Sequence, residues 1–356
     1  MSARDCSHHL ARSWPWLLAA LLAGALGGCS TLGYYAHLAA GETGVLVRRR
    51  PIARVIANPH TAPALRARLQ LALQARAFAS DALGLPRNRS YTLYADLDRP
   101  YVMYNVFATP ALSLQPVRHC FPIAGCVAYQ GFYQLDRAQA AAARLRAAGD
   151  DVYIGGVPAY STLGHFADPV LSTMNRWSDD QLVGTIFHEL AHQQLYVKGD
   201  TVFNESFASF VQREGLRQWH RATHRPADDP AAVRRRQTFT ALVLATRRRL
   251  SALYASDLPD AAKHMRKQAE FARLRRDDQR LRNGEWRGHD DYKTWVDGPL
   301  NNAKLLPFGL YDARVPAFAA LFAQSRRNWK AFYAAARRIG QLPPAQRHAA
   351  LAALAD

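Results

Sequence analysis

The sequence predicts an α+β fold, in which a strand-containing N-terminal part, residues 45–177, precedes a mostly helical part, residues 178–356. Two patterns predict this order. Between Tyr91 and Gln134, β-branched, aromatic and polar residues alternate between Pro and Gly breakers, which is typical of several short strands. From Ser178 onward, apolar residues recur at helical spacing with few strand signals. No internal repeat or long low-complexity linker separates the two parts, so residues 29–356 are expected to form a single unit.

The first 28 residues are typical of a secretion signal, because a short basic start precedes an apolar stretch and a group of small residues. The apolar stretch, from Trp14 to Leu26, is shorter than the roughly 20 residues that a membrane-spanning helix needs. The segment Leu26-Gly27-Gly28-Cys29 resembles the lipobox of bacterial lipoproteins. This resemblance implies cleavage before Cys29, a lipid anchor on that cysteine, and a location at the outer membrane facing the periplasm. An uncleaved anchor or a chance match is the alternative.

The elements between this leader and residue 177 follow from local patterns. An amphipathic helix is expected within residues 60–85, ended by Gly84 and Pro86. Strands are expected within residues 91–97, 101–110 and 126–135, a helix within 136–150, and extended structure with glycines within 151–166.

Two cysteines remain once Cys6 is removed with the leader and Cys29 is acylated, namely Cys120 and Cys126. In an oxidising periplasm, the segment between them is expected to be a short turn closed by a disulfide. Two unpaired thiols are the alternative.

The helical part begins with a clear start signal. Ser178 and Gln181 match a capping box, and acidic residues follow Ser178 in the first turn. This helix is expected to run to Lys198-Gly199, where the glycine permits the left-handed backbone that ends helices. A second helix over residues 201–220, capped by Asp200 or Thr201, should return antiparallel to it. Residues 228–286 are expected to form a long helical hairpin broken near 256–259.

The first of these helices carries the pattern HExxH. His188 and His192 are four residues apart and therefore share one helix face, so both imidazoles can reach one metal ion. Glu189 lies beside that face and can hold the attacking water without being a ligand. His192 and Glu205 lie at equal distances from the turn, about 9 Å along each helix, so Glu205 is expected to complete the ligand set. Glu214 lies further along and is the poorer candidate.

Only six of the 356 residues are Glu, so a chance match that includes Glu189 and Glu205 is improbable. HELAHQ followed by NESFASFV resembles the zinc site of the gluzincin peptidases, especially the aminopeptidase N type. Together with the lipobox, the segments YNVFATP, CFPIAGCVAYQGFY, AYSTLGHFADPVL and NNAKLLPFGLYDARVPAF resemble a family of predicted aminopeptidase lipoproteins of Gram-negative bacteria. The resemblance implies a zincin-like catalytic part with one zinc ion per chain. It also implies a peptide substrate, hydrolysed by metal-activated water with Glu189 as general base.

Such peptidases stabilise the oxyanion of the tetrahedral intermediate with a Tyr or His from a later helix. The resemblance favours Tyr311 in this role, and Tyr292, Tyr254 and His264 are the alternatives. The metzincin pattern HExxHxxGxxH does not fit, because Leu195 and Lys198 occupy the positions of its Gly and last His.

Extended peptides commonly pair with a strand edge, and GGVPAYSTLG is expected to supply one. Gly155 and Gly156 would allow close approach of the substrate, with Tyr160 beside the site. This segment lacks the glutamate that aminopeptidase N enzymes use to bind the free α-amine of the substrate. A structural strand with a turn is the alternative reading of the segment, and endopeptidase action on envelope proteins is an alternative activity.

The charge of the chain does not indicate nucleic-acid binding, although the formal net charge is +18. The excess comes from Arg spread through Ala-rich helices, with few of the aromatics that a stacking platform requires. A solvated basic surface is expected, with attraction to anionic envelope material as the functional alternative. The remaining alternative is a membrane-tethered lipoprotein that retains the zinc site but only binds its partner. Glu189 favours an enzyme over this alternative, since a protein that catalyses no reaction has little use for a general base.

Overall fold

The computed structural model describes residues 33–121, 125–159, 161–227, 229–311 and 314–355. The leader with Cys29 lies outside the described residues, as does Tyr160. The chain divides into one unit up to Val47 and a second unit from Arg48 onward. In the first unit residues 33–46 are helical. None of the helices that the structure describes is both long and apolar enough to cross a membrane.

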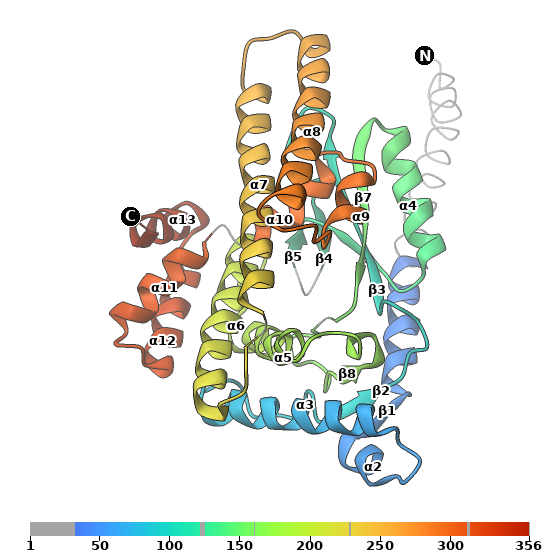
Figure 1. Cartoon of the computed structure of the whole chain (residues 1–356), viewed down its shortest axis with the longest axis vertical. Coiled ribbons are helices and arrows are strands. Elements are labelled where there is room, and N and C mark those ends of the chain that lie inside the picture. Colours follow the sequence, from blue (N-terminus) through green and yellow to red (C-terminus); the bar gives the residue numbers. More distant parts are fainter. Residues whose placement is uncertain (1–32, 122–124, 160, 228, 312–313, 356) are drawn as a thin grey trace, which may run out of the picture. The chain divides into compact units, whose positions relative to one another are not determined.

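The second unit has the expected α+β architecture, with short strands mainly in its N-terminal half (Figure 1). The strands are β1 (Arg49–Pro51), β2 (Leu93–Ala95), β3 (Met103–Pro110), β4 (His119–Phe121), β5 (Gly125–Val127), β6 (Gln130–Phe132), β7 (Asp150–Val157) and β8 (Val170–Leu171). They form sheets of order β1-β2-β8, β6-β3-β7 and β4-β5. Among the strands that the structure describes, β2 and β8 alone pair in parallel. β7 stands last in the order of the second sheet and is therefore one of its edge strands.

In the second unit, the described helices before residue 178 are α2 (Ile52–Ala57), α3 (Pro63–Asp81) and α4 (Leu135–Ala147), with a 3₁₀ turn at Ser172–Met174. The expected helix in residues 60–85 is thus confirmed as α3, which begins with Pro63 in its first turn because proline lacks only an N–H that would be unpaired there. α3 packs against α5, one of the two helices that carry the candidate site.

The C-terminal helices are α5 (Asp179–Gln194), α6 (Thr201–Thr223), α7 (Pro230–Tyr254), α8 (Asp260–Asn283), α9 (Lys293–Asp297), α10 (Leu306–Tyr311), α11 (Val315–Gln324), α12 (Trp329–Gly340) and α13 (Pro344–Ala355). A 3₁₀ turn over Ala303–Leu305 precedes α10. The predicted helical hairpin is confirmed as α7 and α8, broken between Ala255 and Pro259, and the two helices run side by side in Figure 1.

An ion pair between a buried lysine and a partly buried aspartate joins the α7–α8 hairpin to the second sheet. The Lys267 ammonium on α8 donates to the Asp151 carboxylate of β7 at 2.6 Å and to the Ala111 carbonyl at 2.8 Å. Asn302 donates its backbone N–H to the same Asp151 oxygen and accepts from the Tyr254 hydroxyl. This network fixes β7 against the hairpin. Separating the two would be costly, because it would leave a charge without its partner.

The rotation of α6 about its axis is set by aromatic packing. Phe203, Phe207 and Phe210 recur at helical spacing and are buried, so they form one face of α6. This face packs against Phe318 of α11 and Phe332 of α12, at centroid distances of 5.1–5.8 Å for the Phe203–Phe318, Phe207–Phe332 and Phe210–Phe332 pairs. Because that face is occupied by α11 and α12, the residues on the other side of α6 are directed to α5.

Candidate metal centre

The candidate site lies on the antiparallel pair α5 and α6, and α5 starts as the sequence predicted. The Ser178 hydroxyl accepts from the Gln181 backbone N–H at 3.2 Å, and the Gln181 side chain accepts from the Ser178 N–H at 2.9 Å. The expected end at Lys198-Gly199 is wrong, because α5 ends at Gln194 and Leu195 is already extended.

The early end of α5 has a cause in the neighbouring helix. The Asn204 side chain of α6 accepts from the Val197 N–H at 2.7 Å and donates to the Val197 carbonyl at 2.9 Å. These bonds satisfy backbone groups that would otherwise have to be paired within α5. Gly199, with φ +80°, then makes the turn. The Asp200 side chain caps α6 by accepting from the Phe203 N–H at 3.0 Å, which decides between the two expected caps.

Two glycines let α5 and α6 approach each other closely. A Cβ on Gly184 of α5 would lie 2.9 Å from the Gln212 side chain of α6. A Cβ on Gly215 of α6 would lie 2.8 Å from the Phe187 ring of α5. Side chains at these positions would push the helices apart, so both glycines are needed for the short distances at the site between them.

The predicted ligand residues converge. His188, His192 and Glu205 are each 8% exposed. The two Nε2 atoms lie 3.2 Å apart, and the Glu205 Oε2 lies 3.3 Å from His188 Nε2 and 3.7 Å from His192 Nε2. In a tetrahedral zinc site with bonds of about 2.0–2.1 Å, ligand atoms are separated by about 3.3–3.4 Å. The cluster therefore has the spacing and the donor set to bind one metal ion.

The electrostatics of the cluster also fit a cation. Burial would raise the pKa of Glu205, but the charge of His192 and hydrogen bonds from both imidazoles bring it down to about 2. Burial would lower the pKa of His192, but the Glu205 carboxylate and the charge of Glu189 raise it overall. Glu205 is thus ionised at neutral pH, and its negative charge favours a positive charge, a proton or a metal ion, between these three side chains.

Gln212 contacts one of the candidate ligands, and sequence reasoning missed it. Its Oε1 lies 3.2 Å from His188 Nδ1, so it can accept that N–H and direct the Nε2 lone pair to the metal position. Gln212 is two turns after Glu205 on the same face of α6, and this spacing is the sequence signal that could have found it. The Nδ1 of His192 has no hydrogen-bond partner among the residues that the structure describes.

Glu189 follows His188 on α5 and interacts electrostatically with the cluster, while its role as a base stays a prediction. Burial raises its pKa above the ordinary value, the charges of His188 and His192 oppose this rise, and that of Glu205 adds to it. A raised pKa makes the carboxylate a stronger base. The buried Tyr91 is a further neighbour: burial and the charge of Glu189 raise its pKa well above the ordinary value, so its phenol stays neutral.

Tyrosines near the site include one that sequence reasoning missed. The Tyr196 ring lies 6.4 Å from the His192 ring, and burial and the Glu205 charge raise its pKa. Tyr311 ends α10, which packs against α6, but its side chain lies outside the described part of the structure, so its role stays a prediction.

The alternatives to Tyr311 are engaged elsewhere or exposed. Tyr254 donates to Asn302 at 2.8 Å, and burial raises its pKa to about 12. The Tyr292 ring stacks on the Phe239 ring, with the two centroids 3.9 Å apart, and His264 is exposed on α8.

The glycines expected to contact substrate lie in the edge strand β7. Gly156 pairs with Tyr104 and Gly155 with Asn105 of β3. A Cβ on Gly156 would lie 2.5 Å from the Tyr101 ring, so the missing side chain accommodates that ring. A contact with substrate at these glycines stays a prediction, and Tyr160 lies outside the described residues.

A polar network ties the loop after β7 to α5, the helix that carries both histidines. The Gln193 amide, next to His192, donates to Asp168 Oδ2 at 3.1 Å and Ser90 Oγ at 3.2 Å. Asp168 is 3% exposed and also accepts from the Thr162 hydroxyl at 2.7 Å. The acid of this loop is therefore used to hold the loop in place.

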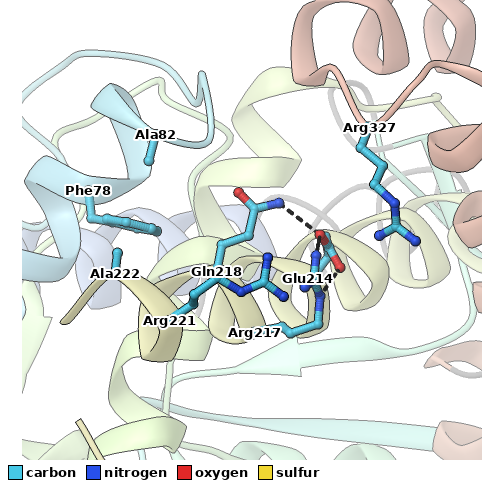
Figure 2. A pocket seen from close by; sticks show the side chains of 8 residues that line it. All are labelled: Phe78, Ala82, Glu214, Arg217, Gln218, Arg221, Ala222 and Arg327. Carbon is cyan, nitrogen blue, oxygen red and sulfur yellow. Dashed lines mark hydrogen bonds and ion pairs between the residues drawn. The ribbon is translucent and has the colours of Figure 1, made fainter. Parts of the chain in front are cut away.

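Glu214, the poorer ligand candidate, is remote from the cluster. Its carboxylate accepts from Arg217 Nε at 2.7 Å and Gln218 Nε2 at 2.8 Å (Figure 2). These residues line a cavity of about 400 Å³, together with Phe78, Ala82, Arg221, Ala222 and Arg327. Neither histidine lines this cavity, which therefore belongs to the second half of α6 and not to the candidate metal centre.

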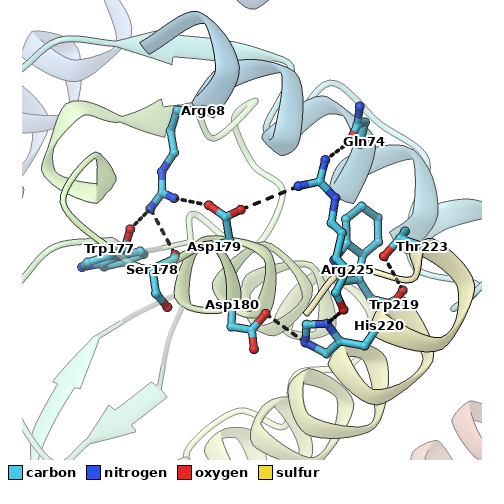
Figure 3. Close-up of polar contacts among 10 residues, drawn as sticks. All are labelled: Arg68, Gln74, Trp177, Ser178, Asp179, Asp180, Trp219, His220, Thr223 and Arg225. Carbon is cyan, nitrogen blue, oxygen red and sulfur yellow. Dashed lines mark hydrogen bonds and ion pairs between the residues drawn. The ribbon is translucent and has the colours of Figure 1, made fainter. Parts of the chain in front are cut away.

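The far ends of α5 and α6 are joined by ion pairs (Figure 3). Asp179 lies 2.9 Å from Arg68 of α3 and 3.7 Å from Arg225, and Asp180 lies 2.9 Å from His220 of α6. These contacts hold the helix pair at the end opposite to the turn.

The architecture and the cluster define an α+β protein with a buried His-His-Glu group that could bind a metal. A family model described as "Putative aminopeptidase" matches residues 33–351, so the chain belongs to this family. Membership indicates a peptidase with a peptide substrate. Comparison with curated proteins and with solved structures gave no match.

Proposed function

We propose that this protein is a zinc-dependent aminopeptidase, tethered to the outer membrane through a lipid on Cys29 and acting on peptides in the periplasm. The observation that supports zinc most directly is the separation of the three ligand atoms, 3.2, 3.3 and 3.7 Å, around the value of about 3.3–3.4 Å for a tetrahedral site. Two imidazoles and one carboxylate leave the fourth position for water or substrate, as in catalytic zinc sites.

When bound, zinc would lower the pKa of a water molecule and polarise the peptide carbonyl. Glu189 takes the proton from the attacking water and delivers it to the leaving amine, for which its raised pKa is suited. Gln212 keeps His188 in the tautomer that binds metal. A tyrosine hydroxyl, from Tyr311 or from Tyr196, donates to the developing oxyanion.

Endopeptidase action is the second candidate, and one observation favours it. An aminopeptidase needs an acid to bind the free α-amine of the substrate, and GGVPAYSTLG contains none. Two acids lie four residues from this segment, and both are engaged: Asp151 accepts from Lys267, and Asp168 is buried and accepts from Ser161, Thr162 and Gln193. An extended substrate with a blocked N-terminus would need no such acid.

The test combines elemental analysis with hydrolysis of matched free and N-acetylated peptides. We expect about one zinc per chain and cleavage of the free peptides. Glu189→Gln should keep the zinc and lose about 100- to 10,000-fold in kcat. Cleavage of acetylated peptides at the same rate would replace the aminopeptidase assignment with an endopeptidase. Zinc-loaded protein that is inert on every peptide would favour a binding lipoprotein.

A further inference from the structure

The hairpin of β4 and β5 is closed covalently. Cys120 and Cys126 are directly opposite in the β4–β5 register and form a disulfide, as the sequence predicted. The closed loop spans six positions, so the bridge holds the start of β5 at a fixed distance from the end of β4. This makes Gly125 and Cys126 a rigid surface for neighbouring elements.

This surface packs directly on the turn between α5 and α6. A Cβ on Gly125 would lie 2.6 Å from the Lys198 side chain and 2.8 Å from the Gly199 backbone nitrogen. Gly125 and Gly199 both have positive φ, +74° and +80°, so glycine is favoured on both sides of the contact for backbone as well as steric reasons.

Arg118 joins the two parts by hydrogen bonds. Its Nη2 donates to the Gly199 carbonyl at 3.0 Å and to the Cys126 carbonyl at 3.2 Å. One guanidinium thus bridges the hairpin and the helix turn. The N–H directions of a planar guanidinium are fixed, so a lysine ammonium at this position would reproduce the bridge only in part.

The turn between α5 and α6 determines where α6 begins. Asp200 directly follows Gly199 and caps the helix, and Asn204 binds both backbone groups of Val197. Glu205 is next to Asn204. A shift of the turn would therefore carry the carboxylate away from the two imidazoles, and ligand geometry tolerates only about 0.5 Å.

We propose that the disulfide-closed β4–β5 hairpin, acting through Gly125 and Arg118, is a positioning element of the metal centre that holds Glu205 against His188 and His192. This inference rests on the proposed metal binding. It assigns a role to the disulfide beyond general stability, because the hairpin contacts Lys198 and Gly199, seven and six residues before Glu205.

The test measures the zinc dissociation constant by competition with a chelating indicator, together with the visible spectrum of the Co²⁺-substituted protein. The variants are Cys120→Ser with Cys126→Ser, Arg118→Gln and Arg118→Lys, and Arg137→Gln on α4 is a control with the same charge change at another exposed arginine. We expect the cysteine pair and Arg118→Gln to raise the dissociation constant about 10-fold, in the range seen for groups that orient ligands.

Arg118→Lys should recover part of the affinity, Arg137→Gln should match wild type, and the Co²⁺ bands should change only in the weakened variants. Equal dissociation constants and spectra in all folded variants would overturn the positioning role while leaving the metal centre intact. Wild-type protein that binds no metal would instead overturn the proposed function, and the inference with it. If the cysteine variant does not fold, Arg118→Gln alone decides, because it keeps the disulfide.

Discussion

Replacing Gln212 with alanine is expected to weaken metal binding while α6 stays folded. The Gln212 Oε1 lies 3.2 Å from His188 Nδ1, and the His188 ring is buried with 8% of its surface exposed. The change removes one hydrogen bond and leaves a buried N–H without its partner, which costs about 1–3 kcal/mol. At about 1.4 kcal/mol per factor of ten, the metal dissociation constant should rise about 5- to 150-fold.

Competition with a chelating indicator measures this change directly. Gln268→Ala, at an exposed glutamine of α8, is the matched control and should leave the affinity unchanged. Gln212→Glu should retain or strengthen binding, because a carboxylate accepts the same N–H more strongly. An affinity of Gln212→Ala within about twofold of wild type, in protein with a native circular dichroism spectrum, would refute the claim that Gln212 orients His188.

Three further predictions follow from the contacts around the site and the fold. The metal affinity of the protein should rise about tenfold per pH unit below the raised pKa of His192, since the imidazole must lose a proton to bind metal. An indicator titration from about pH 6 to 8 measures this dependence, and an affinity that does not change with pH would contradict it. Asn204→Ala removes both bonds to Val197 and should cost about 2 kcal/mol in urea unfolding while also weakening metal binding, whereas unchanged stability would speak against the clamp on the turn. Lys267→Met leaves the Asp151 carboxylate without its cation and should lower the free energy of unfolding in urea by about 3 kcal/mol, with the metal content unchanged. Loss of metal would show that the effect is not confined to the hairpin.

Much of the candidate site was predictable because it depends on local helix geometry. The four-residue spacing of His188 and His192 places both on one face wherever the helix lies. The capping box at Ser178 fixes where that helix begins, and the glycine at 199 fixes the turn. Counting outward from the turn was then enough to bring Glu205 opposite His192, even though α5 ends four residues earlier than expected.

The sequence alone therefore predicted the His188, His192 and Glu205 cluster, the antiparallel helix pair, the α7–α8 hairpin and the cysteine bridge, since each depends on residues close together in the chain. The tertiary structure decided the features that join distant segments. Phe318 and Phe332 set the rotation of α6 from more than a hundred residues away, and Arg118 reaches its turn from the strand region. Periodicity shows which face of a helix is apolar, but the partner that covers it depends on packing of the whole chain, and that information is not local.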